Sequence, residues 1–104
     1  MEQEQQWKKW SGQPVSVPIA EEVNRVLMQE RAAGYELKVC IGTDSQVKGR
    51  ITEFATVIVF IRKGKGGFMY VNKQITRQRM TIKERMLMEV QKSIETGYGL
   101  CNIF

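Results

Sequence analysis

The segment that decides the fold is FATVIVFI, residues 54–61, a run of eight residues in which Thr56 alone is polar. Short apolar runs rich in β-branched residues are typical of strands rather than helices. Because the apolar run has no alternating polar positions, it predicts a strand covered on both faces, and such a strand lies in the middle of a sheet.

Two further strands are predicted on either side of this run. Residues 37–43 alternate apolar and polar side chains, which is the pattern of a half-buried strand. Residues 42–50, GTDSQVKGR, are expected to form a turn-rich connection. After residues 54–61, the glycine-rich segment 63–67 predicts a hairpin loop that leads into a third strand over 68–76. Three consecutive strands with short connections predict an antiparallel meander.

Helices are predicted before and after the meander. The first spans residues 18–33 and ends at Gly34, a residue favoured just past a helix terminus. Its apolar positions repeat at helical spacing and comprise Ile19, Val23, Val26 and Leu27. The second helix spans residues 82–95, and Thr81 with Glu84 forms a capping box at its start. Its apolar stripe, expected to face the sheet, comprises Ile82, Met86, Val90 and Ile94.

These elements predict one α+β domain over residues 18–104, preceded by an N-terminal arm over residues 1–17. Trp7 and Trp10 in this arm are expected to pin it to the body by packing, with stacking on nucleic-acid bases as the alternative. No apolar run reaches the roughly 18 residues of a membrane helix, and the polar start lacks the apolar segment of a signal peptide. We therefore expect a cytoplasmic protein.

The amino-acid composition excludes some kinds of catalytic and metal site and favours one kind of partner. The chain contains no histidine, which excludes imidazole-based catalysis and histidine metal ligands. Cys40 and Cys101 lack the spacing of a zinc site and are expected to be small buried residues, a redox pair being the alternative. The net charge is +5, and residues 36–92 hold twelve Lys/Arg against five Asp/Glu. This basic segment suits a polyanion such as nucleic acid, although a solubilising surface explains it equally well.

Two carboxylates are candidate catalytic and metal-binding residues. Asp44, the one aspartate in the chain, follows the first predicted strand, where a carboxylate is held on a rigid element. An Asx-turn residue is the alternative. Glu89 lies at the edge of the apolar stripe of the second helix, so its carboxylate is expected to point along the sheet-facing side. The alternative for Glu89 is an ion pair with Arg85 or Lys92 on its own helix.

Basic residues are the candidate phosphate contacts. Lys48, Arg77 and Arg79 are assigned to contacts with nucleic-acid phosphates, and Arg77 and Arg79 are expected to lie nearer the two carboxylates than the lysines of the hairpin loop. Lys63 and Lys65, by contrast, are expected to occupy a solvated hairpin tip. Residues 63–67 are not a phosphate-binding P-loop, because no Lys-Ser/Thr pair follows and the next element is a strand.

A known family shares several of these motifs. GTDSQ at residues 42–46, the long apolar strand, the KGKGG hairpin and KERMLMEVQKSIE at residues 83–95 resemble the YkuK-type family of small bacterial ribonuclease H-like proteins. The resemblance spans more than half of the chain. It implies a ribonuclease H-like fold in which Asp44 and Glu89 bind Mg²⁺ or Mn²⁺ for hydrolysis of phosphodiester bonds. Ser45 and Gln46 would shape the metal loop.

The resemblance also implies a departure. Members of this family continue with parallel strands and another acidic residue, whereas this chain ends at Phe104. We therefore expect a partial ribonuclease H-like domain whose open sheet edge promotes homo-oligomerisation. Two functions are consistent with this expectation: a metal-dependent nuclease acting on RNA or DNA, and a non-catalytic nucleic-acid-binding or assembly module of the same fold.

Overall fold

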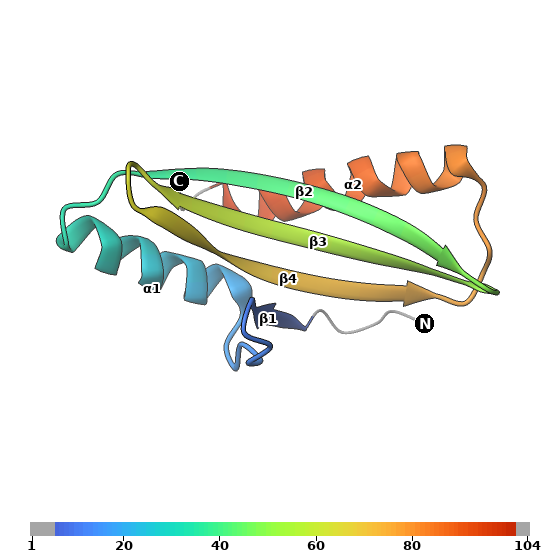
Figure 1. The fold of residues 1–104 in the computed structure, drawn as a ribbon, viewed down its shortest axis with the longest axis horizontal. Helices are drawn as coiled ribbons and strands as arrows, with labels where there is room; N and C mark the ends of the chain where they lie inside the picture. Colours follow the sequence, from blue (N-terminus) through green and yellow to red (C-terminus); the bar gives the residue numbers. More distant parts are fainter. Residues whose placement is uncertain (1–5, 102–104) are drawn as a thin grey trace.

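The computed structural model describes residues 6–101, so residues 1–5 of the predicted arm and 102–104 of the chain's apolar end lie outside it. The α+β class is confirmed (Figure 1). In chain order, the elements are β1 (Trp7–Lys9), α1 (Ile19–Ala32), β2 (Leu37–Lys48), β3 (Ile51–Arg62), β4 (Gly66–Thr76) and α2 (Ile82–Leu100).

The strands form one antiparallel sheet in the order β1-β4-β3-β2. The predicted meander is confirmed, with β3 between β2 and β4. The fourth strand, β1, was not predicted: Trp7 pairs with Asn72 and Lys9 with Tyr70 on β4. Among the described residues, β2 forms one edge of the sheet and β1 the other.

The β2–β3 hairpin is tighter than the sequence indicates. Lys48 pairs with Ile51, so Gly49 and Arg50 alone make the turn. Gly49 has a positive φ of 63°, the conformation that glycine supplies at the first position of a type II′ turn. The predicted turn-rich connection over residues 42–50 is therefore wrong for most of its length, because β2 runs through it. Asp44 lies inside this strand, opposite Ala55.

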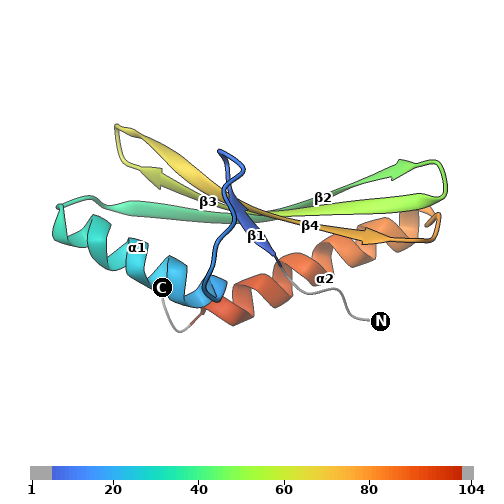
Figure 2. The same ribbon diagram turned by 90° about the horizontal axis from the view of Figure 1, so that it is seen from below.

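Both helices cover the same face of the sheet (Figure 2). Alternate residues of β3 point toward the helices, and among these Phe54, Ile58 and Phe60 are fully buried. The intervening Val57 and Val59 are only partly buried on the other face, which we call the open face. The prediction that β3 is covered on both faces is therefore wrong.

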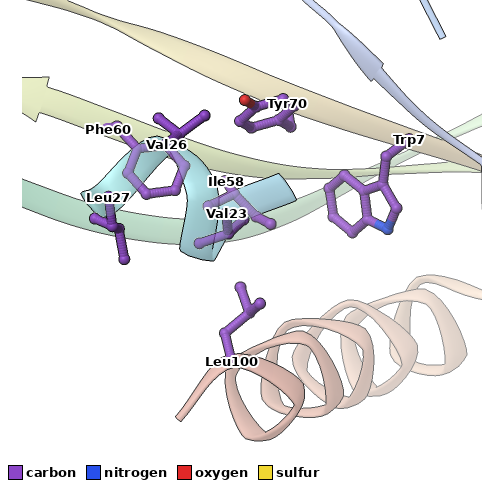
Figure 3. Packing of buried hydrophobic residues seen from close by; sticks show 8 residues of the cluster. All are labelled: Trp7, Val23, Val26, Leu27, Ile58, Phe60, Tyr70 and Leu100. Atoms are coloured by element: carbon purple, nitrogen blue, oxygen red, sulfur yellow. The ribbon is translucent and has the colours of Figure 1, made fainter. Parts of the chain in front are cut away.

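The hydrophobic core lies between α1 and the sheet (Figure 3). The predicted apolar stripe of α1 is confirmed, because Val23, Val26 and Leu27 pack into this core. The core residues are Trp7, Val23, Val26, Leu27, Ile58, Phe60, Tyr70 and Leu100. Trp7 thus pins the N-terminal segment by packing, as expected, whereas Trp10 is 78% exposed.

Charged side chains fasten α1 to the sheet at the border of the core. Glu30 on α1 forms an ion pair with Arg62 on β3, and the guanidinium lies 5.0 Å from the ring centre of Phe68. Glu22, almost fully buried on α1, accepts a hydrogen bond of 2.7 Å from the Tyr70 hydroxyl and pairs with Arg25 at 2.9 Å. These contacts satisfy carboxylates that would otherwise be costly to bury.

The second helix begins as predicted, but its orientation is different. The capping box is confirmed by hydrogen bonds between Thr81 and Glu84 in both directions. The predicted sheet-facing stripe is wrong: Ile82, Met86, Val90 and Ile94 are all more than half exposed. The inner side of α2 is polar instead, because the part of the sheet beneath it carries hydroxyl and amide side chains.

The two cysteines also differ from expectation. Both are exposed, so the prediction that they are buried is wrong. Cys40 lies on the open face of β2, which neither helix covers. No helix within residues 6–101 has the length and apolar character needed to cross a bilayer.

Candidate functional site

The site is built around two regions, the middle of β2 and the end of the sheet where β4 leads into α2. Glu89 on α2 lies over the first of these. Its carboxylate accepts a hydrogen bond from the Ser45 hydroxyl on β2. Arg85, one turn earlier on α2, donates to the same hydroxyl at 3.0 Å and to the Ser45 carbonyl at 2.9 Å. Glu89 therefore faces the sheet, as predicted, and its partner is the hydroxyl of Ser45.

Asp44 lies on the other side of the sheet. Side chains alternate between faces along a strand, so the neighbours Asp44 and Ser45 point in opposite directions. Ser45 is buried under α2, whereas Asp44 is exposed on the open face. Because Asp44 sits within a regular stretch of β2, the alternative of an Asx-turn residue is excluded. The structure does not bring Asp44 and Glu89 together.

This arrangement does not fit a divalent ion shared by the two carboxylates. Mg²⁺ requires near-octahedral oxygen ligands at roughly 2.1 Å, so its protein ligands must converge on one point. Asp44 and Glu89 are separated by strand β2, and the Glu89 carboxylate is already engaged by Ser45. Residues 6–101 contain no group of three Cys, Asp or Glu side chains able to hold a metal ion. A role for Asp44 and Glu89 as metal ligands stays a prediction, as does a metal loop shaped by Gln46.

A layer of polar contacts next to Ser45 joins α2 to the sheet. The hydroxyl of Thr43 lies 3.2 Å from that of Thr56 and 2.8 Å from that of Ser93. The Lys92 ammonium donates a hydrogen bond to Gln74 and lies 5.1 Å from the ring centre of Phe54. Burial lowers the pKa of Lys92 below its ordinary value, although Glu95 partly offsets this effect.

This polar layer was not predicted, although the sequence carries a signal for it. Thr43 and Ser45 are spaced by two along β2, and Ser93 lies one turn beyond Glu89 on α2. A strand face of hydroxyl groups opposite a polar helix face indicates polar packing between layers. Apolar periodicity alone hides that signal, because it assigns the apolar side of a helix to the sheet.

The second region is a group of basic side chains at one end of the sheet. Thr52 pairs with Thr76, so the β2–β3 turn and the segment between β4 and α2 lie at the same end. The exposed cations gathered there, which we call the basic end, are Lys48, Arg50, Arg77, Arg79 and Lys83. The structure thus brings the three predicted phosphate contacts, Lys48, Arg77 and Arg79, to one end of the molecule.

Thr52 holds the two parts of the basic end together. Its hydroxyl donates to the Gln78 carbonyl at 2.8 Å and accepts from the Met80 amide at 3.2 Å. Thr52 is fully buried, so the segment carrying Arg77 and Arg79 is fastened to the start of β3. Arg50, exposed in the turn beside Lys48, was not among the predicted phosphate contacts.

Acidic residues at this end neutralise little of the positive charge. Glu53 lies 3.7 Å from the Lys48 ammonium, at the limit of an ion pair. Glu84 is engaged in the capping box, where the backbone and side-chain hydrogen bonds of Thr81 lower its pKa. The Glu84 carboxylate is therefore occupied at the start of α2. Lys63 and Lys65 are exposed at the β3–β4 turn, at the opposite end of the sheet.

Comparison with known proteins identifies the family. The family model described as Ribonuclease H-like matches residues 18–104, which is most of the chain. The chain belongs to the ribonuclease H-like family. Comparisons with curated proteins and with solved structures find no match. The narrower YkuK-type assignment stays a prediction. Membership of the ribonuclease H-like family points to a nuclease or another nucleic-acid-related function.

Proposed function

We propose that this ribonuclease H-like domain binds nucleic acid through backbone phosphates at its basic end. The observation that carries the proposal is the grouping of exposed cations from two separate segments, Lys48 with Arg50 and Arg77 with Arg79. Arginine and lysine side chains at such a site neutralise phosphates and release bound counterions, which dominates sequence-independent affinity. Arginine adds bidentate hydrogen bonds to phosphate oxygens.

Two further features support binding to nucleic acid, and the first of them indicates binding without base readout. The basic end consists of cations around a tight turn and a connecting segment, and phosphate contacts of this kind position a nucleic acid but carry no sequence information. The family match supports nucleic acid over other polyanions. We therefore expect similar affinities for oligonucleotides of different sequence and a steep dependence on salt.

Fluorescence anisotropy with labelled RNA and DNA oligonucleotides tests the proposal. The variant Lys48→Ala/Arg77→Ala/Arg79→Ala removes three charges from the basic end. The matched control Lys38→Ala/Lys63→Ala/Lys65→Ala removes three exposed charges near the opposite end of the sheet. We expect at least a tenfold loss of affinity in the first variant and less than threefold in the second. Equal losses of affinity in both variants would mean that net charge alone, and not the basic end, determines binding.

A metal-dependent nuclease is the second candidate. One observation favours it: both carboxylates flank the same short part of the edge strand, since Glu89 contacts Ser45 and Asp44 precedes Ser45. The present arrangement of the two carboxylates does not fit a shared ion, so we assign no catalytic step to them. Incubating wild-type protein with RNA, DNA and hybrid substrates in Mg²⁺ or Mn²⁺ decides between binding alone and hydrolysis. Cleavage that is lost in Asp44→Asn would establish the nuclease.

Homo-oligomerisation through the edge of β2 was expected from the sequence and stays a prediction. Features of this edge work against it. The Arg85 guanidinium hydrogen-bonds the Ser45 carbonyl, and Lys38 and Lys48 place exposed charges along the strand. Charged side chains and covering groups are devices that protect edge strands from pairing. Another surface is better suited to a second copy.

A further inference from the structure

The outer side of α2 is an apolar surface that no other described element covers. We call it the α2 stripe, and its side chains are exposed by 52–75%. They are Ile82, Met86, Leu87, Val90, Ile94 and Tyr98. Figure 2 shows α2 lying end to end with α1 beneath the sheet, so α1 does not reach its outer side. Contiguous exposed apolar side chains of this kind mark interaction surfaces of proteins.

The stripe cannot be buried by a rotation of α2 without breaking the contacts on its inner side. That side is held by the bonds from Arg85 and Glu89 to Ser45 and by the Ser93–Thr43 pair. Rolling the helix would bury apolar groups against hydroxyl groups of the sheet and expose Leu100, which is packed in the core. The stripe therefore needs a cover from outside the described residues.

We propose that a second copy of this chain covers the α2 stripe, with the two α2 helices packed antiparallel about a twofold axis at Val90. Met86, Val90 and Ile94 are spaced by four residues and form one ridge along the helix surface. Val90 is the midpoint of this ridge, with Met86 and Ile94 equally far on either side. In a twofold interface each contact occurs twice, so Met86 of each copy meets Ile94 of the other while Val90 meets itself.

Charge favours the antiparallel pairing. A second row of residues spaced by four lies next to the ridge and includes Leu87. This row begins with Lys83 and ends with Glu95. Antiparallel packing brings Lys83 of one copy near Glu95 of the other, whereas parallel packing would place like charges together. A standard-size interface takes roughly 800 Å² from each partner, and the six exposed side chains of the stripe would form its apolar centre.

Sedimentation equilibrium over chain concentrations up to about 100 µM tests the proposal, because interfaces of this size bind in the micromolar range or tighter. Val90→Glu places two carboxylates against each other on the axis, and we expect the dimer dissociation constant to rise roughly tenfold or more. The control is Met28→Glu, which changes an exposed apolar residue of α1. Because both sites are exposed, circular dichroism should show unchanged folding. A wild-type chain that stays monomeric, or a dimer that Val90→Glu leaves intact, overturns the proposal.

Disulfide cross-linking tests the geometry separately. In a Cys40→Ser/Cys101→Ser background, Val90→Cys places one thiol of each copy at the axis. We expect mild oxidation to produce a covalent dimer rapidly from Val90→Cys and slowly from the control Met28→Cys. Equal rates would mean that α2 does not face α2, and would assign the stripe to a different partner.

Discussion

Ser45 and Glu89 join the edge strand β2 to helix α2, while the residue before Ser45 carries its carboxylate on the opposite face of the sheet. Two neighbouring positions thus have opposite environments. Ser45 is buried and binds both Glu89 and Arg85, and Asp44 is exposed on the face that no helix covers. Glu89 therefore acts in the packing of α2 on the sheet, and Asp44 takes no part in that packing.

Substituting the two neighbours should therefore have unequal effects on stability. Ser45→Ala leaves the Glu89 carboxylate and the Arg85 guanidinium without their shared partner, and we expect a loss of about 1–2 kcal/mol in the free energy of unfolding. Asp44→Ala alters an exposed strand position and should cost less than about 0.5 kcal/mol. Urea denaturation followed by circular dichroism measures both. Similar losses for the two variants would contradict the assigned positions.

The separation of the carboxylates also predicts the response to Mg²⁺. We expect amide chemical shifts at Asp44 and Glu89 not to saturate together when Mg²⁺ is titrated to millimolar concentrations, because one ion cannot reach both groups in this arrangement. The comparison is wild type against Asp44→Asn. Saturable shifts at both positions that disappear in Asp44→Asn would show that the carboxylates converge on metal, and would favour the nuclease.

Acid sensitivity should depend on the buried Glu22. Burial alone would raise the pKa of Glu22, but hydrogen bonds from Tyr70 and Arg25 more than offset this, so its pKa lies below the ordinary 4.5. As the pH falls, the Glu22 carboxylate of the unfolded chain is protonated before that of the folded chain. The contribution of Glu22 to the free energy of unfolding is therefore fully present above pH 4.5 and is lost as the pH falls further.

Unfolding measurements between pH 3 and pH 6 check this expectation. Glu22→Gln should lower stability near neutral pH and flatten the decline in acid, since the titrating group is gone. Tyr70→Phe, which removes one of the donors to Glu22, should flatten the decline in part. If the stability of Glu22→Gln fell in acid as steeply as that of wild type, the acid sensitivity would belong to other carboxylates.

The meander could be predicted because its signals are local. The apolar run at residues 54–61 and the glycine-rich hairpin after it indicate a strand and a turn without reference to the rest of the chain. Strand β1 could not be predicted, because three residues show no periodicity and only pairing with β4 makes them a strand. The length of β2 was underestimated because glycine and aspartate disfavour strands, and its pairing with β3 overrides that preference.

The site was less predictable, because its geometry depends on which face each residue takes. A shift of one residue along β2 moves a side chain to the opposite face, so the sequence near Asp44 and Ser45 does not reveal which of them α2 covers. Apolar spacing predicted the position of α2 in the chain, but it predicted that the apolar side of the helix faces the sheet, whereas the polar side does. Lys48 is grouped with Arg77 and Arg79 because the antiparallel order of β2, β3 and β4 puts the β2–β3 turn and the end of β4 at the same end of the sheet.

The salt dependence of oligonucleotide binding tests the central claim most directly. Each phosphate contact on duplex DNA contributes about 0.9 to the slope of log affinity against log salt. We predict that Lys48→Ala/Arg77→Ala/Arg79→Ala lowers the magnitude of this slope by roughly 2–3, whereas Lys38→Ala/Lys63→Ala/Lys65→Ala leaves it close to that of wild type. An unchanged slope in the first variant, or an equal reduction in both, would contradict phosphate binding at the basic end.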